Sequence, residues 1–407
     1  MKERVLCFFI FVVLATFLIV GCDTVVDNLV SSYDTKKIDK DLIEGNTQFV
    51  FDIFKLLNEE GSGKNIFISP LSISSALAMT YNGARTTTKD EMAKALRCEG
   101  IEMEDFNASF RELTAYLNGI KGVKLNIANS IWIKEGEEIR QEFLSTNKKG
   151  FGAHIEELDF SKANSADKIN KWISGATKGK IDKMLEPPIS SDVIMYLINA
   201  IYFKGQWREK FTPKMTHTSQ FHTEDGRSED VEMMYWNGKG EFGTVEGNKV
   251  VRLPYGKGKI AMYCVLPDEG VKIDDFIKSL NAGKWNEIKS SVSEMDDVML
   301  KMPKFKMEYG IKELNENLKI LGMEEAFSDS ADFSGIGKGI YISSVIHKAV
   351  IEVNEEGSKA TGATIAEMSK SVTGEPMQFI ADRSFLFVIA DDETGSILFM
   401  GKMCRGN

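Results

Sequence analysis

The stretch that decides the fold is HKAVIEVNEEGSKATGATIAEMSKSVTGEPMQFIADRSFLFVIA, residues 347–390. Its two ends, residues 347–356 and 379–390, are rich in apolar and β-branched side chains and therefore predict strands. Between them lie 22 residues (357–378) of mostly small side chains. A connection of that length without structure of its own, inside a compact domain, usually has a function.

The small-residue segment alternates with period two. One set carries no charge, whereas Lys359 and Glu367 fall in the other set; the uncharged set is Ser358, Ala360, Gly362, Thr364, Ala366 and Met368. The segment is placed like a loop, yet it could also lie in a sheet with one face buried. A segment that can adopt both states is a bistable element. A surface loop with chance alternation is the other interpretation.

The rest of the chain predicts an α+β protein of one domain. Residues 40–58 have apolar residues at helical spacing before Gly61, Ser69-Pro70 predicts a helix N-cap, and Thr88 to Glu91 reads as a capping box. Residues 165–179 predict a helix, and residues 126–133 and 193–203 predict strands. Two hairpins are expected at 250–267 and 384–403.

Composition excludes several classes of protein. With 43% hydrophobic and 27% charged residues among 407, the chain matches a globular protein and not a disordered, collagen-like or multi-pass membrane protein. The formal net charge of -10 repels phosphate backbones, so we expect no nucleic-acid partner.

The N-terminus predicts export. Lys2 and Arg4 precede an apolar run from Val5 to Val20, and the run ends in Gly21-Cys22, which resembles a bacterial lipoprotein signal. Residues 1–21 are then a signal peptide, Cys22 is the lipidated residue that anchors the chain to a membrane, and residues 22–39 are a tether. An uncleaved anchor is the alternative. Both place the body outside the cytoplasm, lipid-anchored or secreted.

The sequence contains no motif for catalysis or metal binding. GxSxG, the P-loop, HExxH and the Rossmann arrangement of GxGxxG between a strand and a helix are missing, so we expect no enzyme, no catalytic residue and no cofactor. Cys98, Cys264 and Cys404 form neither a disulfide framework nor a zinc site and are expected to be buried fillers. His347, at the start of a strand, reads as a buried hydrogen-bonding histidine.

From about residue 40 to 404 the chain resembles the serpin family. The stretches that carry the resemblance are NIFISPLSISSALAMTYNGA (65–84), INKWISGATKGKI (169–181), LINAIYFKGQW (197–207), LPYGKGKIAMYCVLP (253–267), PKFKMEYGIKELNENLKILGMEEAF (303–327), ADFSGI (331–336), HKAVIEVNEEGSKATGA (347–363) and ILFMGKM (397–403). The resemblance implies a serpin domain at 40–407 with three β-sheets, about nine helices and an exposed reactive-centre loop at 357–378.

The resemblance also implies a mechanism. A serine protease attacks the loop and forms an acyl-enzyme, and the cleaved loop then inserts into the main sheet and carries the trapped protease with it. The hinge would comprise Glu355, Gly357, Ser358, Ala360, Thr361, Gly362 and Ala363. Trp207 and Lys304 would lie where the loop enters the sheet, with Lys304 paired to Glu355. Ser69, Asn199 and His347 would form a hydrogen-bonded cluster under that sheet.

Some positions depart from the family pattern. Lys359 stands where an acidic residue is usual, Thr361-Gly362 replaces alanines, and Ser384 replaces a proline. A non-inhibitory binding or chaperone protein with the serpin fold is therefore the alternative function.

The sequence leaves two candidate peptide bonds for cleavage by the protease. Counting along the loop places it at Ser371-Val372, which suits elastase-like or subtilisin-like proteases, or at Lys370-Ser371, which suits trypsin-like ones. Met368 is a weaker third candidate. We expect the protein to act as a monomer.

Overall fold

The computed structural model describes residues 33–357 and 376–406. This described part contains nine α-helices: α2 (Lys40–Glu60), α3 (Pro70–Tyr81), α4 (Thr86–Ala95), α5 (Met103–Asn118), α6 (Gln141–Phe151), α7 (Ser165–Ala176), α8 (Ile273–Ser279), α9 (Ala282–Ser291) and α10 (Asn315–Ile320). Three short 3-10 helices accompany them at Thr35–Lys37, Pro213–Met215 and Glu325–Phe327.

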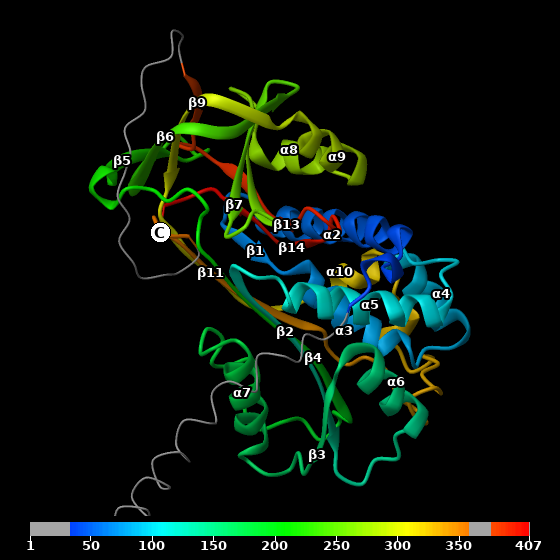
Figure 1. Cartoon of the computed structure of the whole chain (residues 1–407). Coiled ribbons are helices and arrows are strands. Elements are labelled where there is room, and N and C mark those ends of the chain that lie inside the picture. Colours follow the sequence, from blue (N-terminus) through cyan, green and yellow to red (C-terminus); the bar gives the residue numbers. More distant parts are fainter. Residues whose placement is uncertain (1–32, 358–375, 407) are drawn as a thin grey trace, which may run out of the picture. The chain divides into compact units, whose positions relative to one another are not determined.

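Strands of the described chain form three sheets (Figure 1). The largest has nine strands in the order β1-β14-β13-β8-β7-β6-β9-β12, with β5 paired to β6. Their bounds are β1 Ile66–Ile68, β5 His217–His222, β6 Ser228–Val245, β7 Asn248–Tyr255, β8 Ile260–Leu266, β9 Ser293–Pro303, β12 Met377–Ile380, β13 Phe385–Asp391 and β14 Ile397–Met403. Every residue of β8, β13 and β14 is buried, which explains their nearly continuous apolar sequence.

The two smaller sheets have three and two strands. One has the order β3-β2-β4, with β2 at Val123–Lys134, β3 at His154–Leu158 and β4 at Met195–Gly205. The other pairs β10 (Phe305–Glu313) with β11 (Ile346–Val353). Burial alternates strictly along β11, because only one of its faces packs on the core.

The core is built around α2 and the central strands of the large sheet. Phe49, Val50, Ile53 and Phe54 of α2 are fully buried, and they pack in one cluster with residues of α3, β8 and β13. A separate cluster lies under α7 and joins it to β2 and β4. The predicted helix at 40–58 and both predicted hairpins are present, with turns at residues 256–259 and 392–394.

Of two local predictions at helix starts, the one at Thr88 was wrong and the one at Ser69 was confirmed in position. The helix expected to be capped at Thr88 begins at Thr86, and the buried Thr88 hydroxyl instead accepts a hydrogen bond from the Asp332 N–H (2.9 Å). Ser69 is the N-cap residue of α3 and Pro70 its first residue, as predicted, but the Ser69 hydroxyl donates to the Leu398 carbonyl (2.8 Å) and makes no capping hydrogen bond to the helix. Both hydroxyls bond to groups distant in sequence and therefore do not bond to the backbone of the nearby helix.

The packed body begins ahead of Lys40. Within the span assigned to the tether, the N–H of Asp34 donates to Glu112 (2.8 Å), the N–H of Asp39 donates to Ser109 (2.9 Å), and Ile38 is buried. Residues 34–39 therefore belong structurally to the body. Cys22 and the signal peptide lie outside the described residues.

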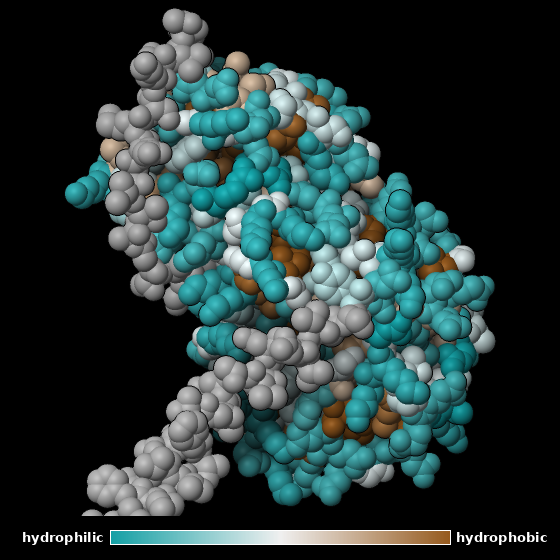
Figure 2. All heavy atoms as spheres, in the orientation of Figure 1, coloured by the Kyte–Doolittle hydropathy of each residue, from teal (hydrophilic) through white to brown (hydrophobic). Residues whose placement is uncertain are grey.

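Polar side chains cover most of the face shown in Figure 2. Across residues 33–357 and 376–406, no helix combines the length and apolarity needed to cross a bilayer. The same residues hold no group of three acidic, histidine or cysteine side chains arranged for a metal. Cys98, Cys264 and Cys404 are buried free thiols, and burial raises the pKa of the Cys404 thiol to about 11.

Candidate functional site

The chain reverses direction at the end of β11. Asn354 and Gly357 exchange two backbone hydrogen bonds (3.0 and 3.1 Å), and Gly357 also bridges to Gln206 beyond β4. Gly357 has φ +132°, and a Cβ there would lie 2.2 Å from the Gly205 carbonyl oxygen. Only glycine fits this turn, which lies where the small-residue segment begins.

Trp207 holds the reversed chain from the β4 side. Its indole N–H donates to the Asn354 carbonyl (2.9 Å), and its backbone N–H donates to the Glu356 carbonyl (3.0 Å). The ring is buried and stacks on Tyr255 of β7 with centroids 4.4 Å apart. The turn therefore rests on an indole that is itself fixed by the large sheet.

Glu355 is held by charge and hydrogen bonds. Its carboxylate lies 3.3 Å from the Lys304 ammonium and accepts a hydrogen bond from the Thr216 hydroxyl (2.9 Å). Burial acts to raise the pKa of this carboxyl, but a backbone N–H, Thr216 and Lys304 outweigh it, so the pKa lies below its usual range. The expected Lys304 to Glu355 pair is present in the structure, together with Thr216, which the sequence did not indicate.

A seam separates β4 from β11. The two strands belong to different sheets, and within the described residues their backbones meet only at the turn near Gly357. Two cavities of about 100 and 40 Å³ follow the seam, the first lined by residues 194–199 and 340–347 and the second by residues 201–203 and 348–352. These linings show that β4 and β11 run parallel, as Figure 1 also shows.

The seam is an opening for one more strand. Facing edges of β4 and β11 present backbone N–H and C=O groups that form no ladder with each other. A chain that reverses at Gly357 would run antiparallel to both strands. It could therefore pair with both edges at once.

Buried polar groups lie beneath the wider cavity. The Ser69 N–H donates to Nε2 of His347 (3.1 Å), and burial lowers the pKa of this imidazole to about 4. Asn199 does not join that bond: its side-chain amide donates to Asn129 (2.7 Å), and its backbone carbonyl accepts from the Ser72 hydroxyl (3.2 Å). The three residues predicted as one cluster thus form two hydrogen-bonded groups near the same cavity.

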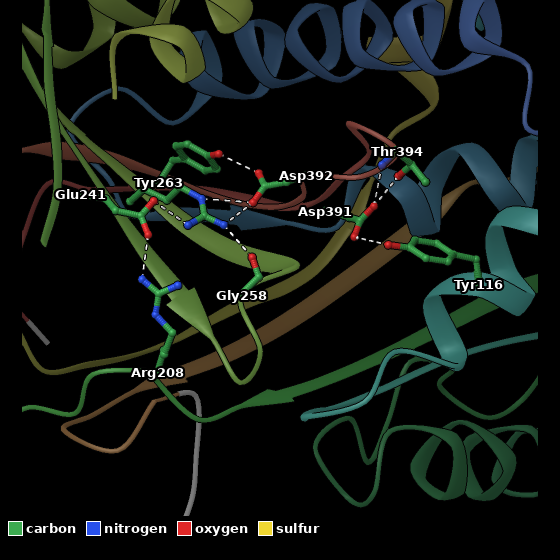
Figure 3. Close-up of polar contacts among 9 residues, drawn as sticks. Tyr116, Arg208, Glu241, Gly258, Tyr263, Asp391, Asp392 and Thr394 are labelled. Atoms are coloured by element: carbon green, nitrogen blue, oxygen red, sulfur yellow. Dashed lines mark hydrogen bonds and ion pairs between the residues drawn. The ribbon is translucent and has the colours of Figure 1, made fainter. Parts of the chain in front are cut away.

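A charged chain extends from Arg208, next to Trp207 (Figure 3). Arg208 pairs with Glu241 (2.8 Å), and Glu241 pairs with Arg252 (2.6 Å). Arg252 in turn contacts Asp392, which also accepts a hydrogen bond from the Tyr263 hydroxyl (2.7 Å). Together with the Arg208 N–H to Pro254 carbonyl bond (2.7 Å), this chain fixes the end of β4 to the large sheet.

The remaining predicted site residues lie outside the described part of the chain. These are Ser358, Ala360, Thr361, Gly362 and Ala363 of the hinge and Lys370, Ser371 and Val372 around the two candidate bonds. The site also contains residues that the sequence did not single out, namely Asn354, Tyr255, Thr216, Ser72 and Asn129. No local motif marks them, because each acts through a partner distant in sequence.

Comparison with known proteins agrees with this architecture. The sequence model described as serpin (serine protease inhibitor) matches residues 44–406, and that description names an inhibitor, not an enzyme. The chain is 36% identical over 379 residues to a leukocyte elastase inhibitor of Bos taurus, covering 89% of this chain and 98% of the relative. It is 33% identical over 381 residues to an uncharacterized serpin-like protein of Methanosarcina acetivorans, covering 90% of this chain and 88% of that protein.

A solved structure shows the same fold. Tengpin, a thermophilic serpin crystallised in its native state, superposes with a TM-score of 0.83 at 33% identity, covering 92% of this chain and 96% of tengpin. The α+β architecture with three sheets expected from the sequence is thereby confirmed. This chain belongs to the serpin family.

Proposed function

We propose that this protein inhibits serine proteases by single-use covalent trapping, with insertion of its cleaved loop into the seam between β4 and β11. The observation that carries the proposal is the open seam that begins at the Gly357 turn. Its two edges are parallel, so a strand returning from that turn would complete antiparallel ladders on both sides. The names of the relatives and of the family support a protease target.

Insertion would release enough free energy to be effectively irreversible. A strand of ~12 residues gaining a net 0.5–1.5 kcal/mol per hydrogen bond contributes about 6–18 kcal/mol. That is similar to the whole stability of a typical domain, ~5–15 kcal/mol. The intact fold is then a kinetically trapped state that cleavage releases.

Chemistry of the trapping step would be supplied by the protease. Its serine hydroxyl attacks the carbonyl of the residue before the scissile bond, the new amino terminus leaves, and an ester joins the two proteins. Insertion before water reaches this ester would prevent deacylation. This chain therefore needs a cleavable loop and a seam, and no triad of its own.

The target class depends on which bond is cut. We propose Ser371-Val372, with Lys370-Ser371 as the alternative, and hence an elastase-like or subtilisin-like protease before a trypsin-like one. All three residues lie outside the described part of the chain. Incubation with elastase, subtilisin and trypsin separately, followed by denaturing gels and peptide mass analysis, locates the bond.

The expected result is a covalent band near the summed masses of the two proteins, with a released peptide that begins at Val372 or Ser371. Clean cleavage of the loop without such a band, for all three proteases, would contradict the inhibitor and favour a non-inhibitory serpin. The position of cleavage distinguishes the two candidate bonds in either case.

We also propose that Cys22 is lipidated and that the body acts outside the cytoplasm as a membrane-anchored monomer. Support comes from the sequence alone, through the apolar run before Gly21-Cys22. Expression of the chain and of a Cys22→Ser variant with a labelled fatty acid tests this. Label and detergent-phase partition should both be lost in the variant, and their retention would contradict lipidation at Cys22.

A further inference from the structure

The larger cavity of the seam has one polar end. Its volume is about 100 Å³, and most of its lining is apolar, contributed by α3, the start of β4 and residues 340–346. Asn199 is the last residue of β4 that lines the cavity, and His347 is the last residue of β11 that does so. The end nearest the Gly357 turn is therefore formed by an amide and an imidazole.

These two side chains lie level with each other across the seam. Gln206 and Asn354 both form a β-bridge to Gly357, which fixes the relative height of the two parallel strands. Asn199 lies seven positions before Gln206, and His347 lies seven positions before Asn354. One small molecule in the cavity can therefore contact both side chains.

Asn199 presents an unpaired acceptor. The residue is 8% exposed, its Nδ2 donates to Asn129 of β2 (2.7 Å), and no described residue donates to its Oδ1. Asn129 is also its direct partner in the ladder between β2 and β4. Because the nitrogen and oxygen of an amide point in opposite directions, an Nδ2 that faces β2 leaves Oδ1 facing the seam. A buried acceptor without a donor is unfavourable, so a ligand that supplies a donor gains affinity.

His347 presents a donor. Its Nε2 accepts from the Ser69 N–H (3.1 Å), so the neutral ring carries its proton on Nδ1. Burial lowers the pKa of this imidazole to about 4, which keeps the ring neutral at physiological pH. Among the described residues, none accepts a hydrogen bond from that Nδ1–H. The polar end thus combines one open acceptor with one open donor.

The lining favours an uncharged ligand. Asp192 is the one charged residue among the described residues that line the cavity, so no ammonium or guanidinium is present to pair with an anion. An unpaired charge in such a site is strongly unfavourable. The hydroxyls of Ser72 and Thr80 already donate to the backbone carbonyls of Asn199 and Ala76. The Nδ1–H of His347 is therefore the donor that remains for a ligand.

An alcohol matches both the polar end and the apolar remainder. Its O–H can donate to Asn199 while its oxygen accepts from His347, which reproduces both hydrogen bonds that a water would make there. Its alkyl chain adds apolar burial against residues such as Ile73 and Leu77 of α3. An engineered cavity of about 150 Å³ binds benzene, so this smaller cavity suits a chain of about six non-hydrogen atoms.

We propose that the larger seam cavity is a binding site for a small uncharged alcohol, whose hydroxyl bridges Asn199 and His347 and whose alkyl chain lies against α3. The site belongs to the resting protein and requires no movement of β4 or β11. It goes beyond the proposed function, because binding is measured without any protease.

Two probes of equal size test the site, 1-pentanol and butyl methyl ether. Both accept a hydrogen bond, but only the alcohol donates one. Binding to the full-length chain is followed by saturation-transfer NMR titration at one fixed detergent concentration, so the share of probe dissolved in micelles is the same for every variant. Ala76→Leu fills the cavity from α3. Ala115→Leu is the matched control, because Ala115 of α5 is also half-buried but does not line this cavity.

We expect 1-pentanol to bind the parent with a Kd on the order of 1 mM. It should bind about two- to tenfold more tightly than the ether, because one net hydrogen bond distinguishes the probes. Ala76→Leu should lose binding of both probes, and Ala115→Leu should retain it. Asn199→Ala should remove the preference for the alcohol. If that variant does not fold, the ratio of affinities in the parent and the loss in Ala76→Leu still decide.

Equal affinities of the two probes for the parent would overturn the site, and so would binding that survives Ala76→Leu or the absence of saturable binding. The result is separable from the proposed function. A chain that traps proteases but binds neither probe would keep the inhibitor and lose the site. A chain that shows the expected binding pattern but traps no protease would keep the site and lose the inhibitor.

Discussion

At the residue scale, the geometry of the turn at position 357 allows only glycine. A methyl group there would overlap the Gly205 carbonyl oxygen, and its φ of +132° is closed to other residues. Gly357→Ala is expected to destabilise the native state by about 2–3 kcal/mol, through strain and displacement of the turn from Trp207. Urea unfolding followed by tryptophan fluorescence measures this loss.

Gly63 provides the control for that substitution. It also has positive φ (+66°), but nothing lies within 4 Å of the place that a Cβ would occupy, so Gly63→Ala should cost only about 1 kcal/mol. Equal losses for the two variants would mean that backbone conformation alone, and not the close approach to Gly205, requires glycine at 357.

His347 makes stability depend on pH. Burial lowers its folded pKa to about 4, whereas an unfolded histidine titrates near 6.5, so the unfolded state binds a proton first as pH falls. The contribution is fully present above pH ~6.5 and is lost progressively toward pH ~4. Between pH 7 and 5 the native state should lose up to about 2 kcal/mol through this group.

His347→Gln should reduce that pH dependence, as read from urea unfolding at pH 7 and pH 5. The matched control is His154→Gln, since His154 is an exposed residue of β3. A variant at His347 that lost stability on acidification as steeply as the parent would show that other groups cause the effect.

At the scale of the element, the segment from Ser358 must be able to enter the seam as a strand. Position 358 belongs to the uncharged set of the alternating pattern, so Ser358→Arg would bring a charge to the face that becomes buried. We expect at least a tenfold shift from covalent trapping to simple cleavage, because burying an unpaired charge costs more than about 1.4 kcal/mol. Ratios of covalent to cleaved bands on denaturing gels measure the partition.

Lys359→Arg is the control, because it places the same arginine side chain at the neighbouring position of opposite parity, where a cation already stands. It should leave the partition near that of the parent. Unchanged trapping by Ser358→Arg would argue against insertion of the hinge, even if inhibition itself were observed.

At the scale of the whole molecule, cleavage should stabilise the fold. A gain of about 6–18 kcal/mol from new hydrogen bonds, over a body of this size, corresponds to a rise in the unfolding temperature on the order of 10–20 °C. Calorimetry of the intact chain and of the chain cleaved in its loop measures this. Cleaved Ser358→Arg should rise less, and an unchanged or lower midpoint for the cleaved parent would contradict the trapped native state.

Much of this fold was determined by local pattern. The helix at α2, the strands β2 and β4 and both C-terminal hairpins follow from apolar periodicity and turn residues, which act over a few neighbouring positions. The period-two alternation after Gly357 and the resemblance to serpins likewise indicated a segment able to become a strand. Lys304, Trp207 and Glu355 could be named in advance because the resemblance supplied their roles.

Only the tertiary structure decided which strand edges are left unpaired and which side chains lie across the seam between them. The open seam between β4 and β11 exists because the edge strands of two sheets lie beside each other without pairing. No local sequence pattern indicates that two strands will stay unpaired. The hydroxyls of Thr88 and Ser69 bond to Asp332 and Leu398, partners more than 200 residues away, and neither makes a hydrogen bond to the first turn of a helix. Lys180 and Glu352 are 172 positions apart, and their contact exists only because the fold carries the segment after α7 across the seam.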